Sequence, residues 1–168
     1  MKKYSISAFF PAYGDEKTIG KMVLDMLEVL KEISNDYEII VVDDGGPDRS
    51  GEIADELSKE YKEVRVIHHG KNKGYGGALK SGFYNARKEL VFYTDGDAQY
   101  DVREIKKLLP YIEEYDVING YKIKRNDPFY RIVFGRLYHY FVKFLFGLKI
   151  RDVDCDFRLM KRKIFDEV

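Results

Sequence analysis

The sequence has one cysteine, Cys155, no tryptophan and no excess of charge of either sign. A single cysteine excludes an internal disulfide and suits a reducing compartment. We expect Cys155 to be a small, buried apolar residue and not a nucleophile. Lysine plus arginine and aspartate plus glutamate both number 29, so no overall electric field favours nucleic acid as a partner. The cysteine and the three histidines lack the spacing of a zinc site. No signal peptide and no run of 18 apolar residues occurs, so no membrane-spanning helix is predicted.

The length of 168 residues predicts one domain, 1–168, and the last residues read as a helix without a capping signal, which suggests a truncated chain. Apolar, β-prone segments alternate with segments of helical periodicity, which predicts an α/β fold with a Rossmann-like, mostly parallel sheet flanked by helices. The expected strands are 5–13 (stopped by Pro11), 37–42, 64–67, 90–94 and 116–119. Helices are expected after Thr18 (as a cap), after the turn 43–50, after the loop 71–77, and over 102–112.

One apolar strand, 90–94, ends in Asp95-Gly96-Asp97. In extended backbone, residues two apart point the same way, so Asp95 and Asp97 can face one ligand. Paired hard oxygen ligands suit Mg²⁺ or Mn²⁺ shared with phosphate oxygens. Asp43 and Asp44 follow the strand 37–42, and ligands of such sheets lie at the carboxyl ends of the strands. The sequence therefore predicts a metal and phosphate site at this edge.

Residues 121–148 differ from the rest of the chain. A basic loop, 121–127, precedes the segment 129–148, in which eight of twenty residues are phenylalanine or tyrosine, three are basic and none is acidic. An amphipathic helix at a lipid interface fits this composition. A helix buried on the sheet or at a dimer contact fits equally well.

The last segment carries acids at every second position: Asp152, Asp154 and Asp156. In an extended chain these three carboxylates would lie on one side and repel one another. Because such an arrangement costs stability, a functional role is favoured over a purely structural one.

Five short motifs occur in a fixed order. They are Phe10-Pro11-Ala12-Tyr13 with Glu16, Val42-Asp43-Asp44-Gly45 with Asp48, Asn72-Lys73-Gly74-Tyr75-Gly76-Gly77-Ala78-Leu79, Asp95-Gly96-Asp97 with Gln99, and Asp156-Phe157-Arg158-Leu159. Together they resemble family 2 glycosyltransferases of the GT-A fold, most closely those that transfer sugar to a polyprenyl phosphate. The matching positions run from Phe10 to Arg162.

The resemblance implies site roles. A metal ion, Mg²⁺ or Mn²⁺, and the donor diphosphate would be held at Asp95, Gly96 and Asp97. The remaining donor-binding positions would be Pro11, Tyr13, Glu16, Asp43, Asp44, Lys73 and Gly76. Near the reacting groups would lie Gln99, Arg125, Arg131, Asp154 and Asp156. Many family members carry glycine at the position of Asp156, so Asp154 and Asp152 remain rivals for the role of base.

The resemblance also implies an inverting transfer from a UDP-sugar or GDP-mannose to dolichyl or undecaprenyl phosphate. The reaction would take place at the cytoplasmic face of a membrane, which the protein would contact through residues 129–148. Whether the protein forms homo-oligomers stays an open question. Two alternatives also stay open: a glycosyltransferase acting on a saccharide hydroxyl, and a non-catalytic nucleotide-sugar-binding scaffold. A Rossmann dehydrogenase is disfavoured, because the glycine loop at Gly74 lacks the third glycine and follows the third strand.

Overall fold

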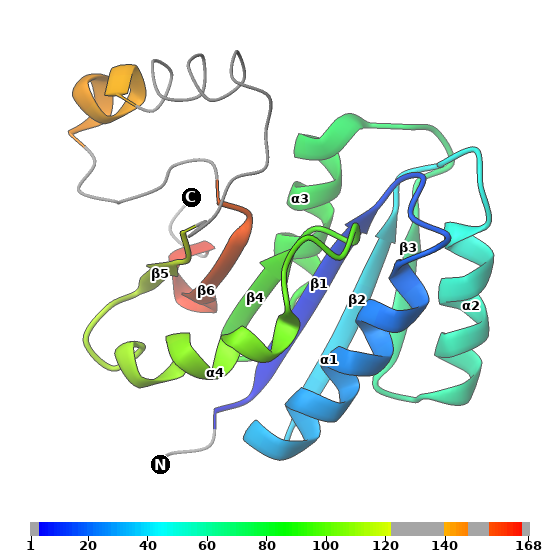
Figure 1. Cartoon of the computed structure of the whole chain (residues 1–168), viewed down its shortest axis with the longest axis horizontal. Helices are drawn as coiled ribbons and strands as arrows, with labels where there is room; N and C mark the ends of the chain where they lie inside the picture. Colours follow the sequence, from blue (N-terminus) through cyan, green and yellow to red (C-terminus); the bar gives the residue numbers. More distant parts are fainter. Residues whose placement is uncertain (1–3, 122–139, 148–154, 166–168) are drawn as a thin grey trace.

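The computed structural model describes residues 4–121, 140–147 and 155–165. It contains a six-stranded sheet with the strand order β3-β2-β1-β4-β6-β5 (Figure 1). The four strands from β3 to β4 are parallel, and β6 pairs antiparallel with both β4 and β5. The predicted α/β fold with a mostly parallel sheet is therefore confirmed. Strand β6, which separates β4 from β5, was not predicted.

The elements have the following bounds. The strands are β1 (Ile6–Ala12), β2 (Tyr37–Asp43), β3 (Val64–His68), β4 (Leu90–Thr94), β5 (Val117–Asn119) and β6 (Phe157–Lys161). The helices are α1 (Ile19–Ile33), α2 (Ser50–Glu60), α3 (Gly74–Asn85) and α4 (Ile105–Leu108). Short 3-10 helices cover Val102–Glu104, Leu109–Tyr111 and Arg162–Phe165.

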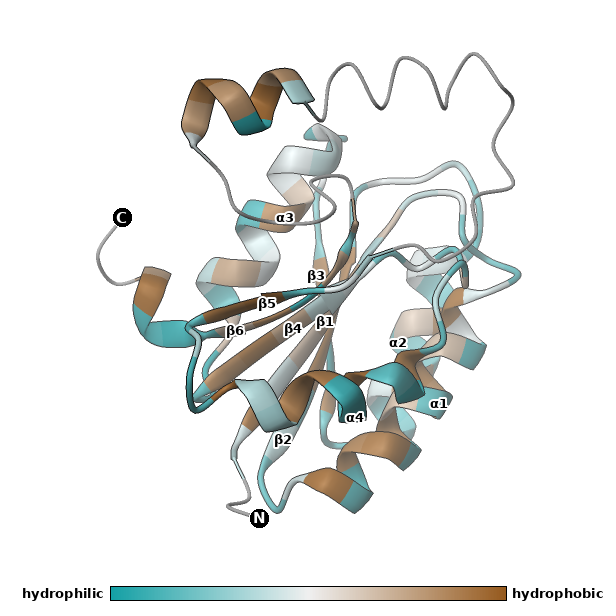
Figure 2. Ribbon diagram, turned by 60° about the vertical axis from the view of Figure 1, so that its left-hand side comes forward, coloured by the Kyte–Doolittle hydropathy of each residue, from teal (hydrophilic) through white to brown (hydrophobic). Residues whose placement is uncertain are grey.

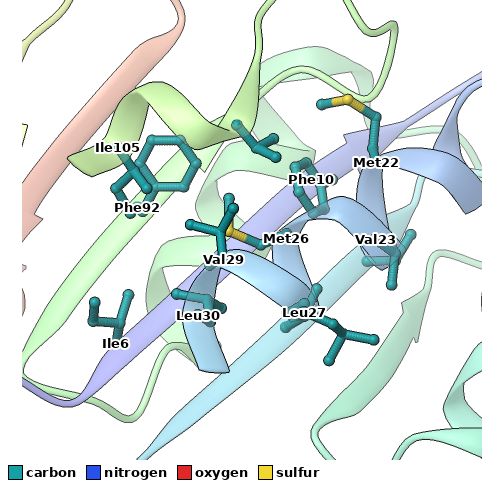
Figure 3. Close-up of a cluster of buried hydrophobic side chains, with 14 of the residues drawn as sticks. Ile6, Phe10, Met22, Val23, Met26, Leu27, Val29, Leu30, Phe92 and Ile105 are labelled. Atoms are coloured by element: carbon teal, nitrogen blue, oxygen red, sulfur yellow. The ribbon is translucent and has the colours of Figure 1, made fainter. Parts of the chain in front are cut away.

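The main core lies between the sheet and the helices α1, α2 and α4. Helix α1 turns one apolar stripe toward the sheet, as its spacing of apolar residues predicts. Figure 3 shows Met26 and Leu30 of this stripe beside Phe10 of β1 and Phe92 of β4. These side chains are fully buried, and they fix the central strands whose ends carry the predicted site.

The second core lies on the other face of the sheet, under α3. Phe9 of β1 stacks on Tyr93 of β4 with ring centroids 5.3 Å apart, and Phe83 of α3 meets both rings edge-on. A Cβ added to Gly82 would lie 2.3 Å from ring atoms of Phe9. Glycine at this position therefore lets α3 approach β1 closely.

Two predicted boundaries were wrong. Pro11 does not stop β1, which continues to Ala12. Because β1 pairs with β4 only as far as Phe9, Pro11 lies where β1 has one neighbour, and proline is tolerated there. The helix predicted over 102–112 is broken into a four-residue α-helix and two 3-10 helices, with Pro110 in the second of these. Proline lacks the N–H that would continue an α-helix.

Residues 140–146 form a further helix, which is part of the aromatic segment predicted at 129–148. It lies at the same end of the molecule as the carboxyl ends of the parallel strands, and its surface is mostly apolar (Figure 2). The exposed fraction of Phe144 is 91%, and those of Phe141 and Phe146 are 63% and 67%. Among the described residues, no helix combines the length and the apolar character needed to cross a bilayer.

Candidate active site

A cavity of about 290 Å³ opens at the carboxyl edge of the sheet. Its lining comes from the ends of β1, β2 and β4 and from the loop that begins α3. The lining residues are Pro11, Ala12, Tyr13, Asp15, Asp44, Asn72, Gly74, Tyr75, Ala78, Asp95 and Asp97. The structure thus brings together five of the predicted site residues, which are spread over 87 positions of the sequence.

Asp95 is half-buried in this cavity beside Tyr75, whose hydroxyl donates a hydrogen bond to Asp95 Oδ1 over 2.8 Å. Burial raises the pKa of Asp95 to about 6, although the bond from Tyr75 opposes this shift. The nearby charges of Asp156, Asp97 and Asp15 contribute to the same rise in pKa. Several carboxylates therefore share a small volume, and a cation bound there would relieve their repulsion.

The carboxylate of Asp97 is held by its own turn. The Gln99 N–H donates to Oδ1 over 3.0 Å, and the Gln99 side-chain amide donates to Oδ2 over 2.6 Å. Ala98, between them, has φ of 61°, a left-handed conformation that residues other than glycine seldom adopt. Gln99, predicted to lie near the transferred sugar, is thus placed against the carboxylate that would share the metal.

Asp156 directly precedes β6 and lies next to Asp95, which directly follows the neighbouring strand β4. The antiparallel ladder pairs Thr94 with Phe157, so the next facing positions are Asp95 and Asp156. The charge of Asp156 also raises the pKa of Tyr75, after burial and the charge and hydrogen bond of Asp95. Of the three acids at 152, 154 and 156, only Asp156 is among the described residues.

The loop after β1 is tied to the Asp95–Asp97 turn. Thr18 does not cap α1 with its side chain, contrary to the prediction; its hydroxyl donates instead to the Gly96 carbonyl over 2.7 Å. Asp15 lies beside the same turn, since its Oδ2 would be 3.4 Å from a Cβ at Gly96. Burial raises the pKa of Asp15, and the charges of Asp97 and Asp48 add to the effect.

Asp44 is almost fully buried where it lines the cavity. Its Oδ1 accepts hydrogen bonds from His69 Nδ1 over 2.5 Å and from the Lys73 N–H over 2.9 Å. Burial alone would raise the pKa of Asp44, but the bonds from His69 and the backbone outweigh it and leave the pKa below its usual value. Asp44 is consequently a fixed, ionised acceptor.

Other predicted residues lie near the cavity but outside its lining. Asp43 accepts from the Gly45 N–H and from His68, and Glu16 accepts from the Arg49 N–H. Lys73 contributes its backbone N–H to Asp44. The others are Gly76, which lines a separate apolar groove along α3, and Gly96, which is buried within the turn between Asp95 and Asp97.

Arg125, Arg131 and Asp154 lie outside the described residues, as do Asp152 and the basic loop. Sequence reasoning missed Asp15, Tyr75 and His69 as members of the site. Asp15 adjoins the predicted Glu16, and Tyr75 belongs to the glycine loop, so both were within reach of the motif comparison. No local pattern marks His69, because its partners are 25 and 12 residues away.

Comparison with known proteins places the chain in a family. Residues 7–168 match the model of glycosyl transferase family 2. The chain belongs to this family. Among its relatives, the glycosyltransferase AglD of Haloferax volcanii is 31% identical over 96% of the chain and 27% of its own length. The undecaprenyl-phosphate 4-deoxy-4-formamido-L-arabinose transferase of Proteus mirabilis is 29% identical over 96% of the chain and 50% of its own length.

The chain thus spans half or less of the length of these two relatives.

Solved glycosyltransferase structures share its fold. The mannosyltransferase PcManGT of Pyrobaculum calidifontis, solved with GDP-Man and Mn²⁺, superposes with a TM-score of 0.72 at 16% identity over 99% of the chain and 47% of its own. Glucosyl-3-phosphoglycerate synthase of Mycobacterium tuberculosis was solved with Mn²⁺, UDP and phosphoglyceric acid. It superposes with a TM-score of 0.72 at 17% identity, over 96% of the chain and 57% of its own length. The GT-A fold is confirmed.

Proposed function

We propose that the protein transfers a sugar from a nucleotide-diphosphate donor to a polyprenyl phosphate at a membrane surface. The observation that carries this proposal is that Asp44, Asp95 and Asp97 line one cavity together. Pro11, Tyr13 and Asp44 would hold the nucleoside, as the family resemblance implies. A relative named for undecaprenyl phosphate supports the acceptor.

The donor set fits a divalent cation. Asp95 and Asp97 offer hard carboxylate oxygens just after the carboxyl end of β4. Mg²⁺ or Mn²⁺ would take its other ligands from diphosphate and water. No group of three or more potential metal-ligating side chains occurs in the described part of the chain. When bound, the ion would neutralise charge on the departing diphosphate. Tyr75 and Gln99 would keep the two carboxylates oriented through their hydrogen bonds.

Asp156 would orient the acceptor phosphate. A phosphate monoester has its second pKa near 6 and is largely ionised at neutral pH, so it needs little help from a base. Asp156 faces Asp95 on the neighbouring strand. This register supports a role for Asp156 near the leaving group and the incoming nucleophile. Arg125 and Arg131 are proposed to bind phosphates, as arginine does with two parallel hydrogen bonds.

The helix at 140–146 is proposed as the membrane contact, at the cytoplasmic face. Its exposed aromatic side chains and Leu145 form an apolar surface that water does not favour. The helix lies at the end of the molecule that carries the cavity (Figures 1 and 2). A lipid phosphate at the bilayer surface would therefore meet the donor there.

Transfer of radiolabelled sugar from UDP-sugars and GDP-mannose to undecaprenyl or dolichyl phosphate tests the proposal. We expect lipid-linked product with Mn²⁺ or Mg²⁺ and none with a chelator. D97A should abolish transfer, whereas D156N should keep a substantial share of it. Transfer to a saccharide hydroxyl but not to the lipid phosphate, or donor binding without any turnover, would refute the proposed acceptor.

A further inference from the structure

Two loops at the carboxyl edge of the sheet are held together by the side chain of Asp48. Loop 1, residues 13–18, joins β1 to α1, and loop 2, residues 44–49, joins β2 to α2. Asp48 Oδ2 accepts a hydrogen bond from the Glu16 N–H over 2.8 Å. Asp48 Oδ1 accepts from the Ser50 hydroxyl over 2.6 Å and from the Ser50 N–H over 3.1 Å. One carboxylate oxygen therefore faces loop 1, and the other faces the start of α2.

Two further contacts join loop 1 to the same region. The Ser50 side chain is buried, and its Oγ accepts from the Asp15 N–H over 2.8 Å. Through Ser50, Asp48 thus also holds Asp15. Glu16 Oε2 accepts from the Arg49 N–H over 3.2 Å, so the two loops exchange hydrogen bonds in both directions. The carboxylate of Glu16, which the resemblance implies is a donor-binding group, is engaged with loop 2.

Loop 1 supplies one wall of the cavity. Tyr13 and Asp15 are among the lining residues, whereas Asp48, Glu16 and Ser50 are not. Asp15 Oδ2 accepts from the Tyr13 N–H over 3.0 Å. The exposed fraction of Tyr13 is 54%, so packing holds its ring only in part. The place of the ring therefore depends on the loop backbone that carries it.

We infer that Asp48 is a positioning residue of the donor site, whose carboxylate holds loop 1 against loop 2 and thereby fixes Tyr13 for the nucleoside. This inference rests on the proposed function, because it takes Tyr13 as a residue that holds the nucleoside. Burial alone would raise the pKa of Asp48, but the bonds from Ser50 and the Glu16 N–H outweigh it and lower the pKa. Both oxygens are thus acceptors at neutral pH.

Asp48 also serves the start of α2, where a carboxylate stabilises a helix. A loss of stability alone would not distinguish this role from the positioning of Tyr13. The two roles differ in what they do to nucleotide affinity, and in whether the effect depends on the Tyr13 ring.

D48N, combined with Y13A, tests the inference. Asparagine has one acceptor oxygen where aspartate has two, so it can accept from Glu16 or from Ser50 but not from both. If Asp48 acts through Tyr13, the loss of affinity caused by D48N disappears once the ring is removed, because the two positions are coupled. E60Q removes a negative charge at the far end of α2 and is the control.

The measurement is the dissociation constant of radiolabelled UDP and of GDP with Mn²⁺, by equilibrium dialysis of the full chain and each variant. The nucleotide that wild type binds more tightly decides. D48N should bind it about tenfold more weakly, as the loss of one hydrogen bond to a charged group does. Y13A should bind it at least about fivefold more weakly, as the loss of an aromatic contact to a base does. E60Q should bind like wild type.

In the Y13A background, D48N should change the dissociation constant by less than about twofold. Thermal unfolding establishes that each variant is folded. If D48N is not, S50A takes its place in the same comparisons with the same expected pattern, because Ser50 links Asp48 to loop 1.

The outcomes separate the inference from the function. A folded D48N variant with wild-type affinity overturns the inference, because Asp48 then serves only α2. An equal loss in both backgrounds overturns it as well, since Asp48 would then act without Tyr13, and so does wild-type affinity in Y13A. Each of these results leaves the transferase proposal standing. Wild-type protein that binds neither nucleotide overturns both.

Discussion

A half-buried carboxylate among other carboxylates costs folding free energy once it is ionised, and Asp95 is such a group. Its pKa is raised to about 6, first by burial. A raised pKa means that its stability contribution is present below the ordinary value of 3.8 and is lost as the pH rises through 6. The D95N variant removes this loss and should retain the bond from Tyr75, since an amide oxygen also accepts.

We therefore expect D95N to be more stable than wild type at pH 8 in a chelator, by about 1–2 kcal/mol after allowance for solvent screening. The two proteins should converge near pH 4. Urea unfolding across this range is the measurement. D25N should behave oppositely, because hydrogen bonds from Lys21 and Arg103 lower the pKa of Asp25 despite its partial burial. Equal stability of D95N and wild type at pH 8 would contradict the account.

At the residue scale, sequence reasoning identified the groups that follow strand ends. Asp44, Asp95 and Asp97 each lie within three residues of the end of an apolar β-prone run. The topology of a parallel sheet brings such positions together. The support from Tyr75 and His69 was not predictable, because it depends on how α3 is placed over the strands. Asp15 was passed over for Glu16, since adjacent residues of a loop point in directions that only the tertiary structure determines.

The close approach of α3 to β1 makes a prediction about two glycines in one helix. In G82A the new methyl would lie 2.3 Å from the ring of Phe9, which is fully buried and stacked on Tyr93. The ring has no room to move, so we expect a loss of about 1–3 kcal/mol. The melting temperature, followed by circular dichroism, should fall by several degrees.

G76A is the matched control in the same helix. No atom lies within 4 Å of a Cβ at Gly76, and alanine favours a helix over glycine by about 0.5–1 kcal/mol. G76A should therefore melt at the wild-type temperature or slightly above it. If both variants lost the same stability, the close packing of α3 on β1 would not be the reason for glycine at position 82.

The helix at 140–146 predicts binding to vesicles that contain anionic lipid. Burial of one phenylalanine in an interface contributes about 1.5 kcal/mol or more, which is about tenfold in affinity. F144S should weaken sedimentation with vesicles by about that factor and leave UDP binding unchanged. Y115S removes an exposed aromatic residue before β5 and should have no effect. Equal binding of F144S and wild type would argue against this helix as the contact.

At the scale of elements, periodicity located the four parallel strands and the three long helices to within a few residues. The breaks in the helix after Asp101 were missed, because Pro110 lies inside a run of otherwise helical spacing. Strand β6 was missed for another reason. Its residues Phe157–Lys161 were considered only as part of the acidic segment and of the last family motif. Their pairing with β4 is set by contacts more than 60 residues apart.

For the whole molecule, two groups of ionisable side chains have opposite effects on the free energy of unfolding as the pH changes. Lowered pKa values at Asp25, Glu38, Asp44 and Asp48 mean that stability is lost as the pH falls below about 4, where these groups protonate. The raised pKa of Asp95 means that stability is lost as the pH rises through 6. The raised pKa of His68, due first to Asp43, acts in the same direction above 6.5.

We expect the free energy of unfolding to pass through a maximum between about pH 4 and pH 6 in a chelator. Mn²⁺ should move the maximum to higher pH, because a cation bound by ionised Asp95 stabilises the folded state. Denaturant unfolding at several pH values, with and without Mn²⁺, measures the shift. A maximum that Mn²⁺ leaves unmoved would show that the Asp95 carboxylate does not bind the ion.

The position of β6 has a consequence for how the protein is made. A ribosome delivers β1 to β4 first, and their parallel pairing can form while residues 157–161 are still unsynthesised. Until then, the outer edge of β4 exposes Leu90–Thr94, five residues that are all buried in the finished protein, as an open template for strand addition. Asp95 also lacks its neighbour Asp156 in this interval. The nascent chain is therefore most exposed to aggregation, and has no complete active site, in the interval between the synthesis of β4 and that of β6.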